Sequence, residues 1–358
     1  MTAIRRSSKN APKTSQPHRP RRAAATRPIV GIDLGGTNIN VGVCEPTGEG
    51  TLRVRPESRV NKKTQAILGV AAVIDRIADA ASESVELAGL TMKQVGGIGI
   101  GAPGALDATA GIVLKAPNLG FVNIPLAARL NKKLGRPVYL ENDVNAAAYG
   151  EWKQGAAVGG RDLLAVWIGT GVGGGLILDG RLYSGGLLTA GEIGHMTLIP
   201  GAPLGRRSVE HNCSRTAIAE RLVFLVGAGH PSALRKSIEE ERKRLRDKGD
   251  FDPSKLIRSR HIADAYKKGD DLTHKVIDET ATLLGTAVAG VVTLLSLPRV
   301  VLGGGLTEAL GEPWVRLVRA AIKANVFPTD LRKVEVLGTA LRDNAGVIGA
   351  AALARENL

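Results

Sequence analysis

Cysteine and aromatic residues are scarce in this chain of 358 residues, and each scarcity excludes a class of protein. The two cysteines, Cys44 and Cys213, are too few for a disulfide framework or an all-cysteine zinc site, and such sparing use is typical of a reducing compartment. Four Phe, four Tyr and three Trp are too few for the stacking platforms of single-strand nucleic-acid binders. We therefore expect a cytoplasmic protein without that kind of nucleic-acid interface.

Long uncharged runs are scarce as well, and a single segment is long enough to be tested as a membrane span. Residues 280–298 form a run of 19 residues without charge, close to the length that crosses a bilayer. The run contains four threonines and one serine and continues directly into a strand-like sequence. Because a helix buried inside a large α/β core has the same composition, we predict a core helix here and no membrane partner.

Acidic residues are missing from the first 28 residues, which contain eight basic ones. Without this segment the chain carries 40 basic and 34 acidic residues, so the net charge of +14 falls to +6. The segment is rich in Pro, Ser, Thr and Ala, shows no apolar period and lacks the hydrophobic core of a secretion signal. We predict a disordered basic tail over residues 1–28, with a transit peptide and a polyanion-binding arm as the alternatives.

A strand, a glycine-rich turn and a second strand occur twice along the chain, first over residues 28–43 and again from residue 163. This pattern and the length indicate two α/β domains with duplicated architecture. The charged run over residues 237–248 predicts an exposed helix. Between the two repeated units, the apolar spacing predicts alternating helices and strands over residues 64–87, 95–100, 125–134 and 137–140.

Three glycine-rich turns follow or separate predicted strands, at Asp33–Asn38, Gly169–Gly175 and Gly303–Gly305. Glycine lets several backbone N–H groups approach a phosphate chain and permits the positive φ angles of such turns. None of the three matches the GxxxxGK[ST] phosphate loop, and the second leads into a strand where a dinucleotide-binding turn would open a helix. The turns therefore exclude these two nucleotide-binding classes.

The ordered motifs of the chain resemble those of the ROK sugar kinases (repressors, open reading frames, kinases), most closely their glucokinase branch. The resemblance begins near Ile29 and implies an actin-like or hexokinase-like (ribonuclease H-like) α/β fold of two domains with a cleft between them. We expect residues 29–141 with 343–358 to form the smaller domain and residues 142–342 the larger. The matching motifs are DLGGTN (33–38), GAPG (101–104), PNL (117–119), END followed by NAA (141–147), GTGVGGG (169–175), GEIGH (191–195) and LGGGL (302–306).

The resemblance implies transfer of a phosphoryl group from ATP, with magnesium, to a sugar hydroxyl, glucose being favoured and its 6-hydroxyl the acceptor. Asp143 is the expected catalytic base, because the attacking hydroxyl gives up its proton to a positioned carboxylate. From its position alone, an N-cap for the following helix is the better interpretation of Asp143, and the match to the family's Asn-Asp pair reverses this preference. The substrate-binding residues implied by the resemblance are Asn118, Asn142, Asp143, Glu192, His195 and Glu210.

On the nucleotide side, the resemblance assigns Asp33 to a hydrated magnesium ion, and hard cations do prefer carboxylate and water ligands. It also suggests a homo-oligomer, either a dimer or a tetramer. The residues that it places near the phosphates and the adenosine are Gly35, Gly36, Thr37, Asn38, Thr170, Gly171, Gly303 and Gly304.

The sequence departs from the family after the Gly-His pair, where most relatives carry CxCGxxGCxE and bind structural zinc through three thiolates and the histidine. Aligned backward from Glu210, the cysteine positions hold Gly201, Pro203 and Ser208, and Cys213 is out of register. We therefore expect no structural zinc, and a loop held by chain stiffness and packing.

Other functions compatible with the motifs are phosphorylation of N-acetylmannosamine or N-acetylglucosamine, and use of polyphosphate as a donor. The LGGGL motif indicates that ATP is at least one donor. The family also includes sugar-sensing transcriptional regulators, which need an N-terminal helix-turn-helix of about 60 residues. Because only 28 residues, most of them polar, precede the first strand, we expect an enzyme with no nucleic-acid partner.

Overall fold

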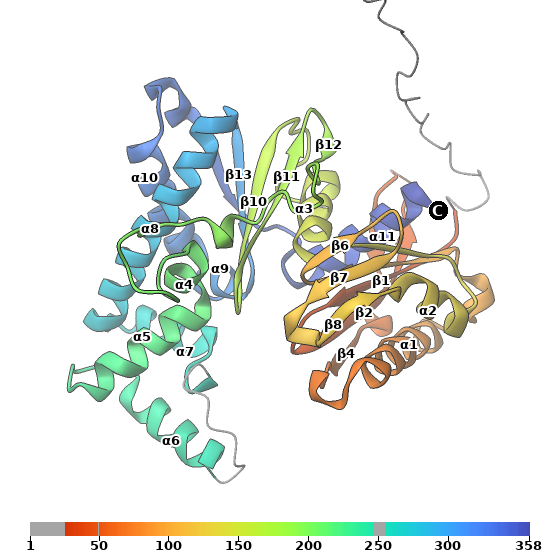
Figure 1. Ribbon diagram of the computed structural model, residues 1–358, viewed down its shortest axis with the longest axis horizontal. Helices are drawn as coiled ribbons and strands as arrows, with labels where there is room; N and C mark the ends of the chain where they lie inside the picture. Colours follow the sequence, from red (N-terminus) through yellow and green to blue (C-terminus); the bar gives the residue numbers. More distant parts are fainter. Residues whose placement is uncertain (1–25, 49, 247–254) are drawn as a thin grey trace, which may run out of the picture.

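The computed structural model describes residues 26–48, 50–246 and 255–358. The basic tail predicted over residues 1–28 lies almost entirely outside the described residues. Two β-sheets organise the chain, and Figure 1 shows them side by side with helices between and around them.

The first sheet contains β1 (Ile29–Leu34), β2 (Asn38–Pro46), β3 (Leu52–Val54), β4 (Val60–Lys63), β5 (Gly97–Ala102) and β9 (Val138–Asn142). Its strand order is β3-β2-β1-β5-β9, and β4 also pairs with β2. β1 is antiparallel to β2, as the predicted hairpin requires, and parallel to β5, which is parallel to β9. β5 is buried along its whole length because helices cover this part of the sheet.

The second sheet contains β10 (Leu163–Ile168), β11 (Val172–Leu178), β12 (Arg181–Leu182), β13 (Arg299–Gly303) and β14 (Glu335–Gly338). Its order is β12-β11-β10-β13-β14. β10 is antiparallel to β11 and parallel to β13, which is parallel to β14. Both sheets thus place an antiparallel hairpin beside two parallel strands, so the duplicated architecture predicted from the sequence is confirmed.

A small sheet of β6 (Ala105–Asp107), β7 (Ile112–Ala116) and β8 (Phe121–Ile124) was missed by the sequence analysis. Its strands have three to five residues, too few for a period-two pattern to stand out. A register shift between Ala105 and Leu106 weakens the pattern further.

The helices are α1 (Val70–Leu87), α2 (Leu126–Leu134), α3 (Asp143–Gln154), α4 (Val209–Cys213), α5 (Arg215–Gly227), α6 (Arg235–Arg246), α7 (Ser259–Lys267), α8 (Asp271–Leu295), α9 (Gly305–Leu310), α10 (Glu312–Asn325) and α11 (Ala345–Asn357). Short 3-10 turns include η2 (Ala66–Leu68), η4 (Pro117–Leu119), η5 (Ile193–His195) and η8 (Arg342–Asn344). The helix predicted from residue 64 begins only at Val70, because Gln65 and Gly69 have positive φ angles of 52° and 88°.

α3 and α11 cross between the two sheets (Figure 1). Their apolar side chains pack with residues of β1, β10 and β13, so the two helices join the sheets through one shared core. Glycine allows the backbones to approach closely here. A Cβ atom on Gly349 of α11 would lie 1.7 Å from the carbonyl oxygen of Ala146, and one on Gly150 of α3 would lie 2.7 Å from that of Ala345. The site described below begins at the first residue of α3.

The uncharged run over residues 280–298 forms most of α8, which is the one helix in the described part of the chain that is long and apolar enough to cross a membrane. The most apolar window of this helix is 56% buried inside the protein. The side chain of Asp270 caps its first turn by accepting a hydrogen bond from the backbone N–H of Thr273. This agrees with the prediction of a core helix.

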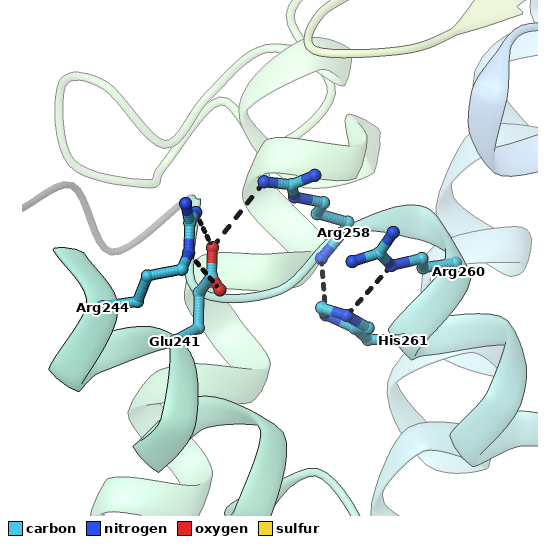
Figure 2. A network of polar contacts seen from close by, with 5 residues as sticks. All are labelled: Glu241, Arg244, Arg258, Arg260 and His261. Carbon is cyan, nitrogen blue, oxygen red and sulfur yellow. Dashed lines mark hydrogen bonds and ion pairs between the residues drawn. The ribbon is translucent and has the colours of Figure 1, made fainter.

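The charged run over residues 237–248 lies mainly in α6, as predicted, and ionic contacts attach this helix to the segment before α7 (Figure 2). The Glu241 carboxylate accepts hydrogen bonds from Arg244 and lies 3.7 Å from the Arg258 guanidinium. His261 accepts from the Arg258 backbone at 3.3 Å. Burial and the neighbouring arginines lower the pKa of His261, which favours its neutral form at this place.

We predict that Gly349→Ala lowers the melting temperature, because the new methyl group would force α11 away from Ala146. Overpacking of this kind costs about 1–3 kcal/mol or more. The matched control is Gly290→Ala in α8, where an added Cβ meets nothing within 4 Å. Removing a mid-helix glycine there should leave the melting temperature unchanged or raise it. Equal melting temperatures for both variants would contradict the close crossing.

Candidate active site

Residues from all three glycine-rich turns line two adjoining pockets. The small pocket has a volume of about 350 Å³ and the large pocket one of about 490 Å³, within the usual range for small-molecule sites. The small pocket includes Asp33, Gly304 and Asp343, whereas the large pocket includes Asn118, Glu192 and Glu210. The residues that line both are Gly35, Gly36, Asp143, Val144, Trp167, Gly169 and Thr170.

Asp143 is the first residue of α3 and does not serve as its cap. The cap is Asn142, whose side-chain oxygen accepts hydrogen bonds from the backbone N–H groups of Val144 at 3.0 Å and Asn145 at 3.1 Å. Asn142 stands at the end of β9, one position before the Ala-rich helix. The structure therefore assigns capping to Asn142 and leaves the Asp143 carboxylate facing both pockets.

The surroundings of Asp143 favour a carboxyl group that can gain and lose a proton near neutral pH. The pKa of Asp143 is raised to about 7, mainly by burial and then by the negative charges of Asp33 and Glu192, against a hydrogen bond from the Val144 N–H that lowers it. A carboxylate with a pKa close to the working pH is suited to general base chemistry.

The large pocket brings together all the residues predicted on the substrate side. Glu192 and His195 come from η5 and the residue before it, and their Oε2 and Nε2 atoms lie 3.9 Å apart. Both side chains reach solvent, with 40% and 73% of their surfaces exposed. Asn118 lies in η4 close to Gly36, where a Cβ atom would come within 3.2 Å of its side chain.

Glu210 lies in α4 and links the large pocket to the second glycine turn. Its Oε2 atom accepts a hydrogen bond of 3.0 Å from the backbone N–H of Val172. A Cβ atom on Gly171 would lie 2.2 Å from the same oxygen, so only glycine permits this approach. Glu210 therefore also orients the turn, a structural task that the sequence analysis did not foresee.

The first glycine turn is held by two hydrogen bonds from Thr64, which is fully buried. Its hydroxyl donates to the carbonyl oxygen of Gly35 at 2.7 Å, and its backbone N–H donates to that of Thr37 at 2.9 Å. The Asp33 carboxylate, at the end of β1, accepts a hydrogen bond of 3.1 Å from Asn40. Thr37 and Asn38 line the small pocket, as predicted.

Carboxylates dominate the small pocket, since Asp33, Asp143, Glu308 and Asp343 line it beside one guanidinium group, that of Arg342. Burial raises the pKa of Asp33, and the charge of Asp343 adds to this effect. Such an excess of negative charge fits a hydrated divalent cation. Within the described ranges no group of three or more side chains is arranged to ligate a metal directly. A magnesium ion here would be held mainly through water and phosphate oxygens, as is usual for this ion.

Several residues that line the small pocket were not predicted as site residues from the sequence, among them Trp167, Glu308, Arg342 and Asp343. Only Trp167 carried a signal, because it stands two residues before the second glycine turn. Gly303, predicted to face the nucleotide, ends β13 and packs against the Trp167 ring, where a Cβ atom would lie 2.5 Å from the ring. Gly304 and Gly305 are the glycines of that turn that line the pocket.

The loop without the family's cysteines is closed by backbone and side-chain hydrogen bonds. Thr197 and Ser208 form an isolated bridge, and the Ser208 hydroxyl caps α4 at 3.2 Å. The Asn212 side chain donates to the carbonyl oxygen of Arg206 at 3.0 Å. Cys213 is fully buried in the core beside α8. These contacts supply a means of holding the loop, and the absence of zinc stays a prediction.

Comparison with known proteins gives the family of the chain. A model of the ROK family matches residues 29–357. The chain belongs to the ROK family. The glucokinase of Halalkalibacterium halodurans is 31% identical over 329 residues, which cover 91% of this chain and 94% of that protein.

A solved structure extends the likeness of this ROK protein to three dimensions. The ROK family glucokinase of Streptomyces griseus, in complex with glucose and AMPPNP, matches with a TM-score of 0.76 at 30% identity, covering 92% of this chain and 99% of that chain. The xylose repressor of Caldicellulosiruptor bescii is 29% identical, with 91% of this chain and 77% of that protein covered. The predicted family and the two-domain hexokinase-like fold are thus confirmed.

For this ROK protein we predict that Asp143→Asn lowers kcat by about 10²-fold or more, because an amide cannot accept a proton from the attacking hydroxyl. In the unaltered protein kcat/KM, with both substrates well below KM, should rise with pH as Asp143 loses its proton near pH 7. Below that range it should fall about tenfold per pH unit. Near-normal turnover of Asp143→Asn would exclude Asp143 as the base.

Proposed function

We propose that this chain is a hexokinase-type enzyme that transfers the γ-phosphoryl group of ATP to the 6-hydroxyl of glucose. One observation carries the proposal: the Asp143 carboxylate lies at the junction of the two pockets, where its Oδ1 atom accepts the N–H of the adjacent Val144 at 2.9 Å while Asn142 caps α3. A carboxylate at this point is within reach of a hydroxyl in one pocket and of a phosphate in the other. The relatives named glucokinase support glucose as the acceptor.

The large pocket is the proposed sugar subsite. Asn118, Glu192, His195 and Glu210 present amide, carboxylate and imidazole groups, which suit the alternating donors and acceptors of sugar hydroxyls. Asn142 uses its oxygen to cap α3 and donates one Nδ2 proton to the carbonyl oxygen of Gly104 at 3.3 Å, so its second Nδ2 proton is the one left for a hydroxyl. Asp143 accepts the proton of the 6-hydroxyl as that oxygen attacks phosphorus.

The small pocket is the proposed nucleotide subsite. Backbone N–H groups of the turns at Gly35–Asn38 and Thr170–Gly171 would bind phosphate oxygens, and Gly304 would adjoin the adenosine. Asp33 would hold a hydrated magnesium ion, which neutralises charge on the phosphates. The excess of carboxylates in this pocket supports a cation between protein and phosphate.

A second candidate is phosphorylation of N-acetylmannosamine or N-acetylglucosamine. The exposure of Glu192 and His195 at the rim of the large pocket favours it, because a bulky acyl group at that rim would reach solvent. We further propose that the protein works in the cytoplasm as a dimer or tetramer. The two cysteines support a reducing compartment, since both are free and buried.

The test is a coupled assay of ADP release with ATP, magnesium and a panel of hexoses and N-acetylhexosamines. We expect glucose to give the highest kcat/KM, and Asp143→Asn to abolish most of the signal with every sugar. A preference for an N-acetylhexosamine would replace the acceptor but keep the mechanism. No ADP release with any sugar, together with tight sugar binding in calorimetry, would contradict the kinase assignment and favour a sugar sensor.

A further inference from the structure

Glu151 is a fully buried carboxylate that the proposed chemistry does not use. It lies on α3, eight residues after Asp143, and accepts hydrogen bonds from backbone N–H groups of Ala156 at 2.6 Å, Ala340 at 3.2 Å and Leu341 at 2.8 Å. The hydroxyl of Thr339 donates to it as well. Burying a charged carboxylate costs several kcal/mol unless donors of this kind surround it. The four donors offset this cost, and the segments they come from show what Glu151 holds together.

The donors belong to the connection that leads from the second sheet back to α11. Residues 339–341 follow β14 and precede η8, and α11 then packs on β1 and β5 of the first sheet. The hydroxyl of Thr339 also accepts a hydrogen bond of 2.9 Å from the backbone N–H of Arg342. Glu151 thus attaches the returning chain to α3.

Both elements joined by Glu151 form walls of the small pocket. α3 contributes Asp143, Val144 and Ala147, and the returning chain contributes Arg342, Asp343 and Gly346. No residue of the returning chain lines the large pocket in the described structure. Because α3 lines both pockets, what Glu151 fixes is the position of the returning chain, which forms a wall of the small pocket alone.

The charge of Glu151 also affects the pKa of a carboxyl group that lines the small pocket, that of Glu308. The pKa of Glu308 is raised to about 7, mainly by burial and then by the neighbouring Asp343, and the charge of Glu151 is a smaller contribution in the same direction. This supports the geometric link between Glu151 and the pocket wall.

We propose that Glu151 is a positioning residue for phosphoryl transfer, which clamps the returning chain against α3 and so holds the small pocket in register with Asp143. This inference rests on the proposed function, in which the small pocket binds the nucleotide. Glu151 itself touches neither substrate.

The direct test is Glu151→Gln, which keeps the size of the side chain but turns an NH₂ group toward N–H donors. We expect KM for ATP to rise about tenfold, corresponding to the loss of one buried hydrogen bond, while KM for glucose changes by less than about twofold. The matched control is Glu356→Gln on α11. Glu356 joins α11 to α3 through Tyr149 and Lys153 but lines neither pocket, so both KM values should stay unchanged.

A second variant keeps the inference testable if Glu151→Gln does not fold. Thr339→Val removes the hydroxyl that contacts both Glu151 and Arg342, and it should raise KM for ATP selectively, by a smaller factor. Unchanged KM values in both variants, or equal rises for ATP and glucose, would overturn the inference.

Calorimetric titration with AMPPNP and magnesium separates this inference from the proposed function. If the unaltered protein binds AMPPNP but phosphorylates no sugar, the proposed function fails, and weaker AMPPNP binding by Glu151→Gln still supports the clamp. If the unaltered protein is an active kinase and Glu151→Gln binds AMPPNP and glucose normally, the clamp fails alone.

Discussion

The close crossing of α3 and α11 is the constraint on which the site depends. Glycines at the contact allow the two helix backbones to pack directly against each other. A Cβ atom added to Gly349 would lie only 1.7 Å from the carbonyl oxygen of Ala146. The crossing joins the sheets in one core, because side chains of both helices pack with β1, β10 and β13. Since α3 begins at Asp143, the position of that carboxylate between the pockets follows from the crossing.

Two adjacent residues at the start of α3 have different roles, since Asn142 caps the helix and Asp143 lines both pockets. Asn142 satisfies the first N–H groups of the helix, so Asp143 is not required for capping. The environment then raises the pKa of Asp143 to about 7, mainly by burial and then by the charge of Asp33. One carboxyl group thereby gains the proton affinity that general base catalysis requires.

The sequence predicted the parts of the site that lie on local motifs. The turn at Asp33–Asn38, the strand end before Asp143 and the pair Glu192 and His195 lie in short motifs through which the chain resembles the family. The residues that the resemblance picked out in these motifs line the two pockets. Glu308 and Asp343 reach the small pocket only through the packing of α9 and η8, which no local spacing encodes. The short strands β6–β8 were not predicted because a few residues carry no reliable period. The start of α1 was predicted too early because the positive φ angles of Gln65 and Gly69 were not evident from the apolar spacing.

In the proposed function, Asp143 links a sugar in the large pocket to a nucleotide in the small one. A crystal structure with glucose, AMPPNP and magnesium would show whether it does. We expect the sugar 6-hydroxyl at hydrogen-bond distance from the Asp143 carboxylate, about 2.6–3.2 Å, with its oxygen facing the γ-phosphorus. A 6-hydroxyl held by another group, or a sugar seated in the small pocket, would contradict it.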